Sequence, residues 1–480
     1  MRILLASSEV HPYSKTGGLA DMVGALARAL AKMGHETGVV TPLYQGISRH
    51  TSPLEEAGIE LNLQLGPGQV CGKVLRHQPM KGLTVYFVDQ PEFFDRPTLY
   101  HKRGVDFPDN AARFMFFSKA VAHLARLLGP DVIHAHDWQT GFVPLLLLHQ
   151  RQREGWGNAP RTCFTIHNMA YQGLFPATLY PLSNLPWDYF TSQVEFYGQM
   201  SCLKAGIASA DKLTTVSPRY AREITTPEFG CGLDGLLRHR QSAMIGILNG
   251  VDYDEWNTVR NPLVTPPFSA DDLDGKALNK IALQKEMGLP VDAAIPLFGS
   301  ITRMVDQKGI DIMLGALEEM LPAELQFVLL SSADSPPFEK AFRDLAARYP
   351  KQVAIKFGFD QPLSHRIEAG IDFFLMPSRF EPCGLNQLYS LRYGAIPVVR
   401  ATGGLDDTVV DVAEDAAAAD GIKFMEYSSR ALAKAIRKAL VLFREPELLR
   451  RFRLNGMRAD FSWERTGIDY VRLYERLKGQ

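Results

Sequence analysis

Short apolar runs alternate with amphipathic segments through the first half of the chain. Residues 2–8 predict a buried strand, and beyond two glycines an apolar residue recurs every three or four positions from Leu19 to Leu30, which predicts a helix that ends near Gly34. Further strands are predicted at 37–41, 83–88, 131–135, 162–166, 213–216 and 245–248, and a helix at 111–128. Strands that alternate with helices indicate an α/β fold with a parallel, doubly wound sheet.

The same alternation begins again near residue 296. A strand at 296–301, a helix at 309–321 and a strand at 326–331 start a second series that continues to residue 398. Two such series predict two Rossmann-like domains. Residues 253–274 are rich in Pro, Asn and Asp and show no sustained period, so we interpret them as a linker with the boundary near Trp256.

The tail of the chain carries aromatic and aliphatic residues at helical spacing between residues 461 and 477, which predicts a packed helix. We therefore expect an N-terminal domain at 1–255, a C-terminal domain at 256–460 and a final helix at 461–480. Open α/β sheets bind ligands at the carboxyl ends of their strands, so two facing domains would form a cleft lined by both sets of loops.

Composition excludes several classes of protein. Of the 480 residues 46% are hydrophobic and 22% are charged, without an apolar stretch of the length that a membrane span needs. The 52 Lys and Arg residues are balanced by 53 Asp and Glu residues, which argues against binding to nucleic acid or an anionic membrane. The five cysteines form no C-x-x-C pair, and the apolar start is too short for a signal peptide, so a reducing cytoplasm is expected.

A glycine-containing loop joins the first predicted strand to the first predicted helix. In Lys15-Thr16-Gly17-Gly18, the two glycines let the backbone approach a ligand, and free N–H groups with the helix dipole attract phosphate. The alternative is an ordinary glycine turn with a surface lysine. The loop matches neither G-x-G-x-x-G nor the P-loop.

Two cations flank a helix start in the second series. Arg303 follows the strand that ends near residue 301, and Lys308 precedes the next helix. A diphosphate that departs as an anion needs such partners. Solvated loop charges are the alternative interpretation.

A third strand-to-helix junction places Glu381 at the end of a strand at 373–376 and before a helix at 385–393. A carboxylate in that position can bind sugar hydroxyls or stabilise positive charge at a reacting carbon. It can also simply complement the helix dipole. Cys383 lies beside the helix start without a paired histidine, so we interpret it as a small packing residue.

Histidines end two strands of the first series, in His134-Ala135-His136-Asp137-Trp138 and in Thr165-Ile166-His167-Asn168. Alternate residues of a strand share a face, so His134 and His136 could bind a metal together, but further ligands are lacking and no metal is expected. The favoured interpretation is that one histidine packs and that His136, Asp137, His167 and Asn168 present hydrogen-bonding groups to a polyol. Both histidines could equally be satisfied core residues.

Taken together, these motifs resemble the family of bacterial glycogen synthases and plant starch synthases. The resemblance rests on residues 15–21, 134–138, 167–173, 249–252, 303–309 and 378–385, which occur in the family's order and span nearly the whole chain.

The resemblance implies a two-domain GT-B fold and transfer of glucose from ADP-glucose to the non-reducing end of an α-1,4-glucan with retention of configuration. It implies no metal and no cofactor, and it implies that the last helix crosses back to the first domain. Its implied catalytic residues are Glu381, His167, Arg303 and Lys308. Its implied donor site comprises Lys15, Thr16, Gly17, Gly18, Arg303, Lys308, Cys383, Gly384, Leu385 and, near the base, Phe359. Its implied sugar and acceptor region comprises Asp21, His136, Asp137 and Asn168.

Other functions remain open on the sequence. A transferase that uses UDP-glucose and a glucan phosphorylase share the fold. An NAD-dependent oxidoreductase would also have Rossmann-like domains, but the chain lacks G-x-G-x-x-G with a downstream acidic residue. A non-catalytic glucan-binding protein would not need the diphosphate-binding residues. The sequence leaves the oligomeric state open.

Overall fold

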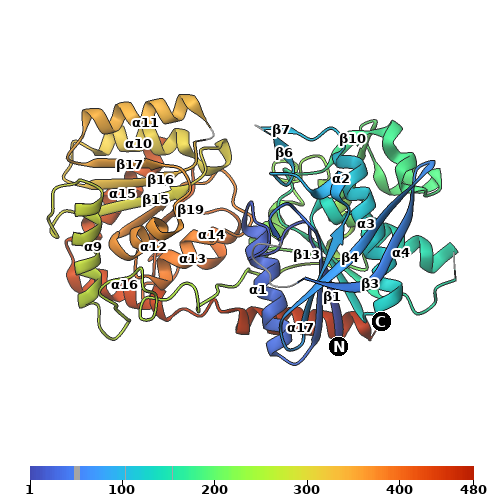
Figure 1. Ribbon diagram of the computed structural model, residues 1–480. Helices are drawn as coiled ribbons and strands as arrows, with labels where there is room; N and C mark the ends of the chain where they lie inside the picture. Colours follow the sequence, from blue (N-terminus) through green and yellow to red (C-terminus); the bar gives the residue numbers. More distant parts are fainter. Residues whose placement is uncertain (48–53, 103, 154, 334, 480) are drawn as a thin grey trace. The chain divides into compact units, whose positions relative to one another are not determined.

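The computed structural model describes residues 1–47, 54–102, 104–153, 155–333 and 335–479. The chain divides into two compact units, which are drawn in Figure 1. The first unit comprises Met1–Gly250 and Trp463–Gln480, and the second comprises Val251–Ser462. Each unit contains its own sheet, so the predicted α/β fold with two doubly wound domains is confirmed.

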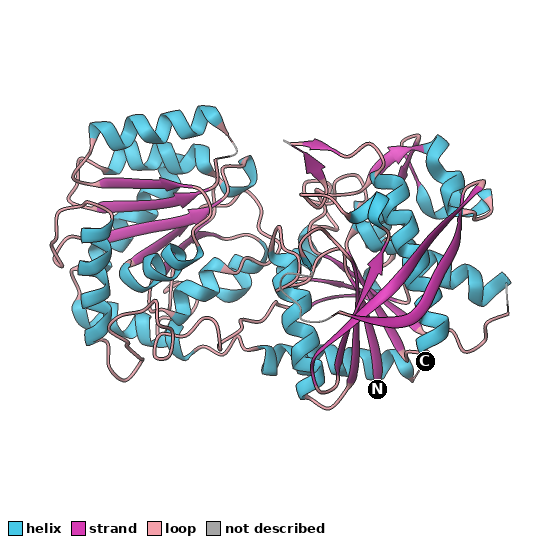
Figure 2. Cartoon of the chain, viewed as in Figure 1, coloured by secondary structure: helices cyan, strands magenta, loops and turns pink. Residues whose placement is uncertain are grey.

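The main sheet of the first unit has the strand order β14-β13-β9-β8-β1-β2-β5-β4-β3 within the described residues. Strands from β14 to β5 pair in parallel, and β4 pairs antiparallel with both of its neighbours. The strands are β1 (Arg2–Ala6), β2 (Glu36–Pro42), β3 (Glu55–Leu65), β4 (Gly68–Met80), β5 (Leu83–Asp89), β8 (Val132–His136), β9 (Arg161–Ile166), β13 (Lys212–Thr215) and β14 (Met244–Gly246). Figure 2 shows the long hairpin β3–β4 at the edge of this sheet.

Helices cover this sheet, and two small sheets lie in its connections. The helices are α1 (Gly18–Lys32), α2 (Pro91–Phe94), α3 (Asn110–Leu128), α4 (Phe142–Arg153), α5 (Trp187–Tyr189), α6 (Cys202–Ser209), α7 (Pro218–Glu223), α8 (Asp234–His239) and α17 (Trp463–Lys478). The small sheets are β10 (Leu174–Pro176) with β12 (Gln199–Ser201) and β11 (Glu195–Phe196), and β6 (His101–Lys102) with β7 (Val105–Asp106).

The final helix α17 packs on the first unit beside α1. A Cβ atom on Gly467 would lie 2.7 Å from the Met33 methyl carbon, so the two helices approach closely because position 467 has no side chain. The Tyr474 hydroxyl lies 2.7 Å from Nδ1 of His134 on β8. Tyr474 is fully buried, and α17 therefore forms part of the first core.

The second unit contains a parallel sheet with the strand order β17-β16-β15-β18-β19-β20 within the described residues. The strands are β15 (Leu297–Thr302), β16 (Gln326–Ser331), β17 (Val353–Phe357), β18 (Phe373–Met376), β19 (Ile396–Arg400) and β20 (Ile422–Phe424). The helices are α9 (Asp274–Glu286), α10 (Ile310–Met320), α11 (Pro336–Arg348), α12 (Gln361–Gly370), α13 (Asn386–Arg392), α14 (Gly403–Thr408), α15 (Ser429–Phe443) and α16 (Pro446–Arg458).

Both faces of this second sheet are buried. On β16, Phe327 and Leu329 join one apolar cluster with residues of α10, α11 and α15, whereas Val328 and Leu330 join another with residues of α9 and α12. Successive strand residues point to opposite faces, so a run of consecutive apolar residues marks a sheet covered on both sides.

The segment 253–274 is not a linker, so that prediction was wrong. Trp256, Val264 and Phe268 are buried in a cluster of the second unit. The ring of Trp256 stacks on that of Tyr389, with centroids 3.6 Å apart. The segment lacks a period because it is an irregular layer over α13, held by apolar burial.

The observed boundaries consequently lie at Val251 and Trp463, against the expected 256 and 461. The Val251 N–H donates to the Phe461 carbonyl at 2.7 Å. This hydrogen bond joins residues at the two ends of the second unit. The unit therefore begins before Trp256.

We expect Trp256→Ala to lower the free energy of unfolding of the second unit by about 3–5 kcal/mol, because it leaves a cavity against Tyr389. Thermal or chemical unfolding followed by tyrosine and tryptophan fluorescence measures this loss. The control Val259→Ala lies in the same segment, where the side chain is 58% exposed, and should change the free energy by no more than about 0.5 kcal/mol. Equal effects of the two substitutions would contradict a core role for Trp256.

Candidate active site

The loop from β1 to α1 carries the first group of predicted donor residues. Gly17 and Gly18 are exposed, and α1 begins at Gly18. The first N–H groups of a helix lack intrahelical acceptors, and Gly17 has no side chain that could cap them. Lys15 forms an ion pair with Asp21 at 2.7 Å, which joins a predicted donor residue to a predicted sugar residue.

Two amides of this loop are not free, which corrects the sequence prediction. The buried carboxylate of Glu9 accepts the Thr16 N–H at 2.5 Å and the Gly17 N–H at 3.3 Å. It also accepts the Thr16 hydroxyl at 2.8 Å and the Tyr100 hydroxyl at 2.7 Å. Glu9 was missed because it follows the first strand without any motif, and Tyr100 because it lies 91 residues away in sequence.

The histidines gather at the ends of β8 and β9. The rings of His134 and His136 lie 4.0 Å apart between centroids, and Nδ1 of His136 lies 3.1 Å from Nε2 of His167. His134 is bonded to Tyr474 and Thr165 and is a satisfied core residue. Burial lowers the pKa of His134 and of His167 to about 3, so both rings are neutral near pH 7.

Asp137 follows β8 with a backbone φ of 57°, a strained conformation for a residue with a side chain. Its Oδ1 accepts the His167 N–H at 2.8 Å, which ties the ends of β8 and β9 together. Burial raises the pKa of Asp137 to about 7, although the N–H groups of His167 and Asn168 oppose the shift. Near neutral pH this carboxyl can therefore bind a hydroxyl as donor or as acceptor.

Asn168 and His167 are only partly buried, and the Asn168 side chain accepts the Ala170 N–H at 3.0 Å. The described residues include no group of three or more His, Cys, Asp or Glu side chains arranged to hold a metal ion. The local role of the histidine cluster is thus packing by His134 and presentation of polar groups by Asp137, His167 and Asn168.

The second unit brings Lys308 and Glu381 together. Nζ of Lys308 lies 2.6 Å from Oε2 of Glu381, which also accepts the Ser378 hydroxyl at 3.0 Å. Glu381 is 5% exposed. The pair joins the loop after β15 to the loop after β18, and neither residue is a solvated loop charge.

The backbone of these two loops is also joined. The Arg379 N–H donates to the Gln307 carbonyl at 2.8 Å. Gly309 has a φ of +66°, and a Cβ atom there would lie 2.1 Å from the Pro377 carbonyl oxygen. Glycine at this position is therefore required by both conformation and contact. Arg303 is exposed and forms no ion pair with the described residues.

The remaining predicted donor residues lie around the same junctions. Cys383 is buried, Gly384 has a φ of +74°, and Leu385 precedes α13, which begins one residue later than predicted. Asn386 donates to the Ile301 carbonyl at 2.7 Å and so fixes α13 to β15. Phe359 follows β17 and is 90% exposed.

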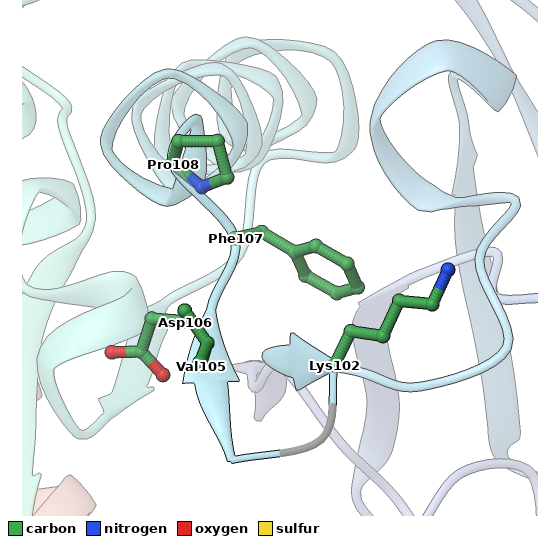
Figure 3. A pocket seen from close by; sticks show the side chains of 5 residues that line it. All are labelled: Lys102, Val105, Asp106, Phe107 and Pro108. Atoms are coloured by element: carbon green, nitrogen blue, oxygen red, sulfur yellow. The ribbon is translucent and has the colours of Figure 1, made fainter.

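A separate surface hollow lies at the β6–β7 hairpin, where the labelled side chains of Figure 3 surround it. Its lining residues are Lys102, Val105, Asp106, Phe107 and Pro108. None of them belongs to the predicted site, so the hollow adds nothing to it. No helix in the described part of the chain has the length and apolar character of a membrane span.

Comparisons with known proteins identify the family of the chain. The family model for the starch synthase catalytic domain matches residues 2–239, and that for glycosyl transferases group 1 matches residues 289–458. A glycogen synthase from Anaeromyxobacter dehalogenans is 48% identical over 99% of both chains, and one from Koribacter versatilis is 45% identical over 100% of this chain and 98% of its own.

A solved structure gives the same result. The catalytic domain of starch synthase IV from Arabidopsis thaliana, bound to ADP and acarbose, has a TM-score of 0.88 and 32% identity over 100% of this chain and 99% of its own. The matches and the two doubly wound sheets define a glycosyltransferase of the GT-B fold. The predicted resemblance is confirmed: the chain belongs to the family of bacterial glycogen synthases and plant starch synthases.

The low pKa of His134 predicts a dependence of stability on pH. An unfolded histidine titrates near 6.5, so the native state binds fewer protons, and the stability from this group is present above pH 6.5 and lost as pH falls toward 3. His134→Gln removes this contribution. The difference in unfolding free energy between parent and variant should therefore shrink by about 2 kcal/mol from pH 7 to pH 5.

Urea unfolding of both proteins at the two pH values measures this change. The other buried groups titrate alike in parent and variant, so their contributions cancel when the two unfolding free energies are subtracted at each pH. A difference that stays constant across this range would show that folding does not lower the pKa of His134.

Proposed function

We propose that the chain transfers glucose from ADP-glucose to the non-reducing end of an α-1,4-glucan, with retention of configuration. The observation that carries the proposal is the buried pair Lys308–Glu381 at the end of the second sheet. The family membership supports it, and so does the Arabidopsis starch synthase structure with ADP and acarbose.

The cations account for departure of the nucleoside diphosphate. Lys308 and Arg303 would stabilise the negative charge that develops on the leaving phosphate, together with Lys15 and the first amides of α1. A charge fixed in place before the reaction needs no reorganisation in the transition state. Gly18, Gly384 and Leu385 would bring backbone N–H groups to the diphosphate, and Gly17 would leave room for it because it has no side chain. Thr16 and Cys383 would lie beside them, and Phe359 would contact the base.

The hydrogen bonds of Glu381 with Lys308 and Ser378 favour a stabilising role over a nucleophilic one. A carboxylate that accepts both Lys308 and Ser378 is weakened as a nucleophile, because both bonds stabilise its lone pairs. We therefore assign Glu381 to stabilisation of positive charge at the reacting carbon. Retention then follows from attack by the acceptor hydroxyl on the face that the leaving group departs from, with its proton passing to the departing phosphate.

The first unit would hold the sugar and the acceptor. Neutral His167 can donate one hydrogen bond and accept another, and Asp137 and Asn168 offer further polar groups. His136 would act through its contact with His167, and Asp21 through Lys15. We expect the reaction to need no metal and no cofactor, since Lys15, Arg303 and Lys308 would supply the positive charge.

One assay tests the donor and the reaction together. Release of nucleoside diphosphate is measured with ADP-glucose and with UDP-glucose, each with and without glycogen. We expect glycogen-dependent release of ADP and much slower release of UDP. Faster release from UDP-glucose would overturn the donor assignment, and glucose 1-phosphate formation from glycogen and phosphate would indicate a phosphorylase.

We expect Arg303→Ala and Lys308→Ala each to lower kcat/KM for ADP-glucose by about 10²–10³-fold, as loss of a preorganised charge partner does. Initial rates of ADP release measure the effect. The control Lys340→Ala removes an exposed lysine on α11 that pairs with Asp344, and should leave the rate unchanged. Turnover within a few-fold of the parent for both site variants would refute the electrostatic mechanism.

A further inference from the structure

The loop between β1 and α1 binds the carboxylate of Glu9, a residue of the same loop. Glu9 is 3% exposed and accepts four donors: the N–H and hydroxyl of Thr16, the N–H of Gly17 and the hydroxyl of Tyr100. The hydroxyls of Ser8 and Tyr100 lie 2.7 Å apart, which extends the network. A buried carboxylate with this many donors fixes the orientation of every group that it bonds.

The contacts determine which amides of the loop remain for a ligand. Those of Thr16 and Gly17 point at Glu9, while the first amides of α1 have no intrahelical acceptor. Lys15 precedes the clamped residues and projects to Asp21. The loop conformation is therefore set by an internal carboxylate before any phosphate arrives.

We propose that Glu9 is a positioning residue for donor binding: its carboxylate holds the loop Lys15–Gly18 in the conformation that receives the donor's diphosphate. This inference rests on the proposed function, and it adds a residue that no motif of the sequence marks. Among the described residues, the Glu9 carboxylate forms its hydrogen bonds with Thr16, Gly17 and Tyr100, so its effect on the reaction passes through Thr16 and Gly17.

The effect of Glu9 on stability distinguishes a positioning role from a purely structural one. Burial raises the pKa of Glu9 above its ordinary value, against the lowering effect of Tyr100 and Thr16. For a carboxyl with a raised pKa, the stability from this group is present below its unfolded pKa and lost as pH rises. The ionised form consequently costs stability at pH 7, which is expected of a group kept for function.

Asp211 is a matched control, since it lies at the amino ends of strands in the same sheet, whereas Glu9 follows the carboxyl end of β1. Asp211 accepts the Thr162 N–H at 2.8 Å and the Thr162 hydroxyl at 2.9 Å, the same pair of donors that Glu9 takes from Thr16. Burial raises the pKa of Asp211, but hydrogen bonds from Arg151 and Thr162 outweigh it and lower the pKa. Asp211 therefore stabilises the fold at pH 7, and it lies at the amino ends of β9 and β13.

The experiment compares Glu9→Gln, Glu9→Ala and Asp211→Asn in the full chain at pH 7. We expect Glu9→Ala to raise KM for ADP-glucose by about tenfold or more, because charge-assisted bonds to the loop are lost. Glu9→Gln keeps the shape but only one acceptor oxygen, so its KM should rise less, with an unchanged or higher melting temperature. Asp211→Asn should lower the melting temperature and leave KM for the donor within twofold.

A variant of the loop provides a second measurement if Glu9→Ala does not fold. Thr16→Val removes the hydroxyl donor and keeps the backbone N–H, so it should raise KM for ADP-glucose in the same direction. Combined with Glu9→Gln, its effect should be less than additive, because both changes remove the same contact. KM for glycogen should stay constant in all of these variants.

Three results would overturn the proposal: KM for the donor unchanged in both Glu9 variants, KM lowered in Glu9→Gln, or a fall in melting temperature in Glu9→Gln without a kinetic effect. Failure of the proposed function is a distinct result, because it appears in the parent as absence of ADP release. If the parent uses UDP-glucose instead, the same comparison is made with KM for that donor.

Discussion

A buried carboxylate at the end of a strand organises the loops in each unit. Glu9 follows β1 and binds the Thr16 and Gly17 amides, and Glu381 follows β18 and binds Lys308 and Ser378. Removal of a carboxylate from water is costly, and the donors that converge on each of these two groups offset part of that cost. Each carboxylate binds donors of its own loop together with one donor that is distant in sequence, Tyr100 for Glu9 and Lys308 for Glu381. The carboxylate thereby fixes loop positions that apolar packing alone would leave loose.

The sequence predicted the strands that lie in the sheet cores, because consecutive apolar residues mark a strand buried on both faces. It also indicated Lys308 and Glu381, which follow strands and belong to motifs of the family. It missed the hairpin β3–β4, although Ile59, Leu61 and Leu63 alternate with polar residues at the period of a half-buried strand.

Long-range partners explain the other errors. Residues 253–274 were interpreted as a linker because they have no period, whereas burial of Trp256 against Tyr389 orders them without regular structure. Glu9 carries no motif, and the burial that gives it a role depends on Tyr100. A local pattern reports the element to which a residue belongs, but it contains no information about a partner brought close by the tertiary fold.

The histidine cluster of the first unit is uncharged near neutral pH. Burial lowers the pKa of His134, His136 and His167, so the three neighbouring rings remain neutral and do not repel one another. Burial also raises the pKa of Asp137 to about 7. A neutral, hydrogen-bonding surface suits a sugar, whose hydroxyls both donate and accept, whereas the cationic side chains of Lys308 and Arg303 suit a diphosphate. The packing of α17 against His134 helps to maintain the dry environment that keeps this histidine neutral.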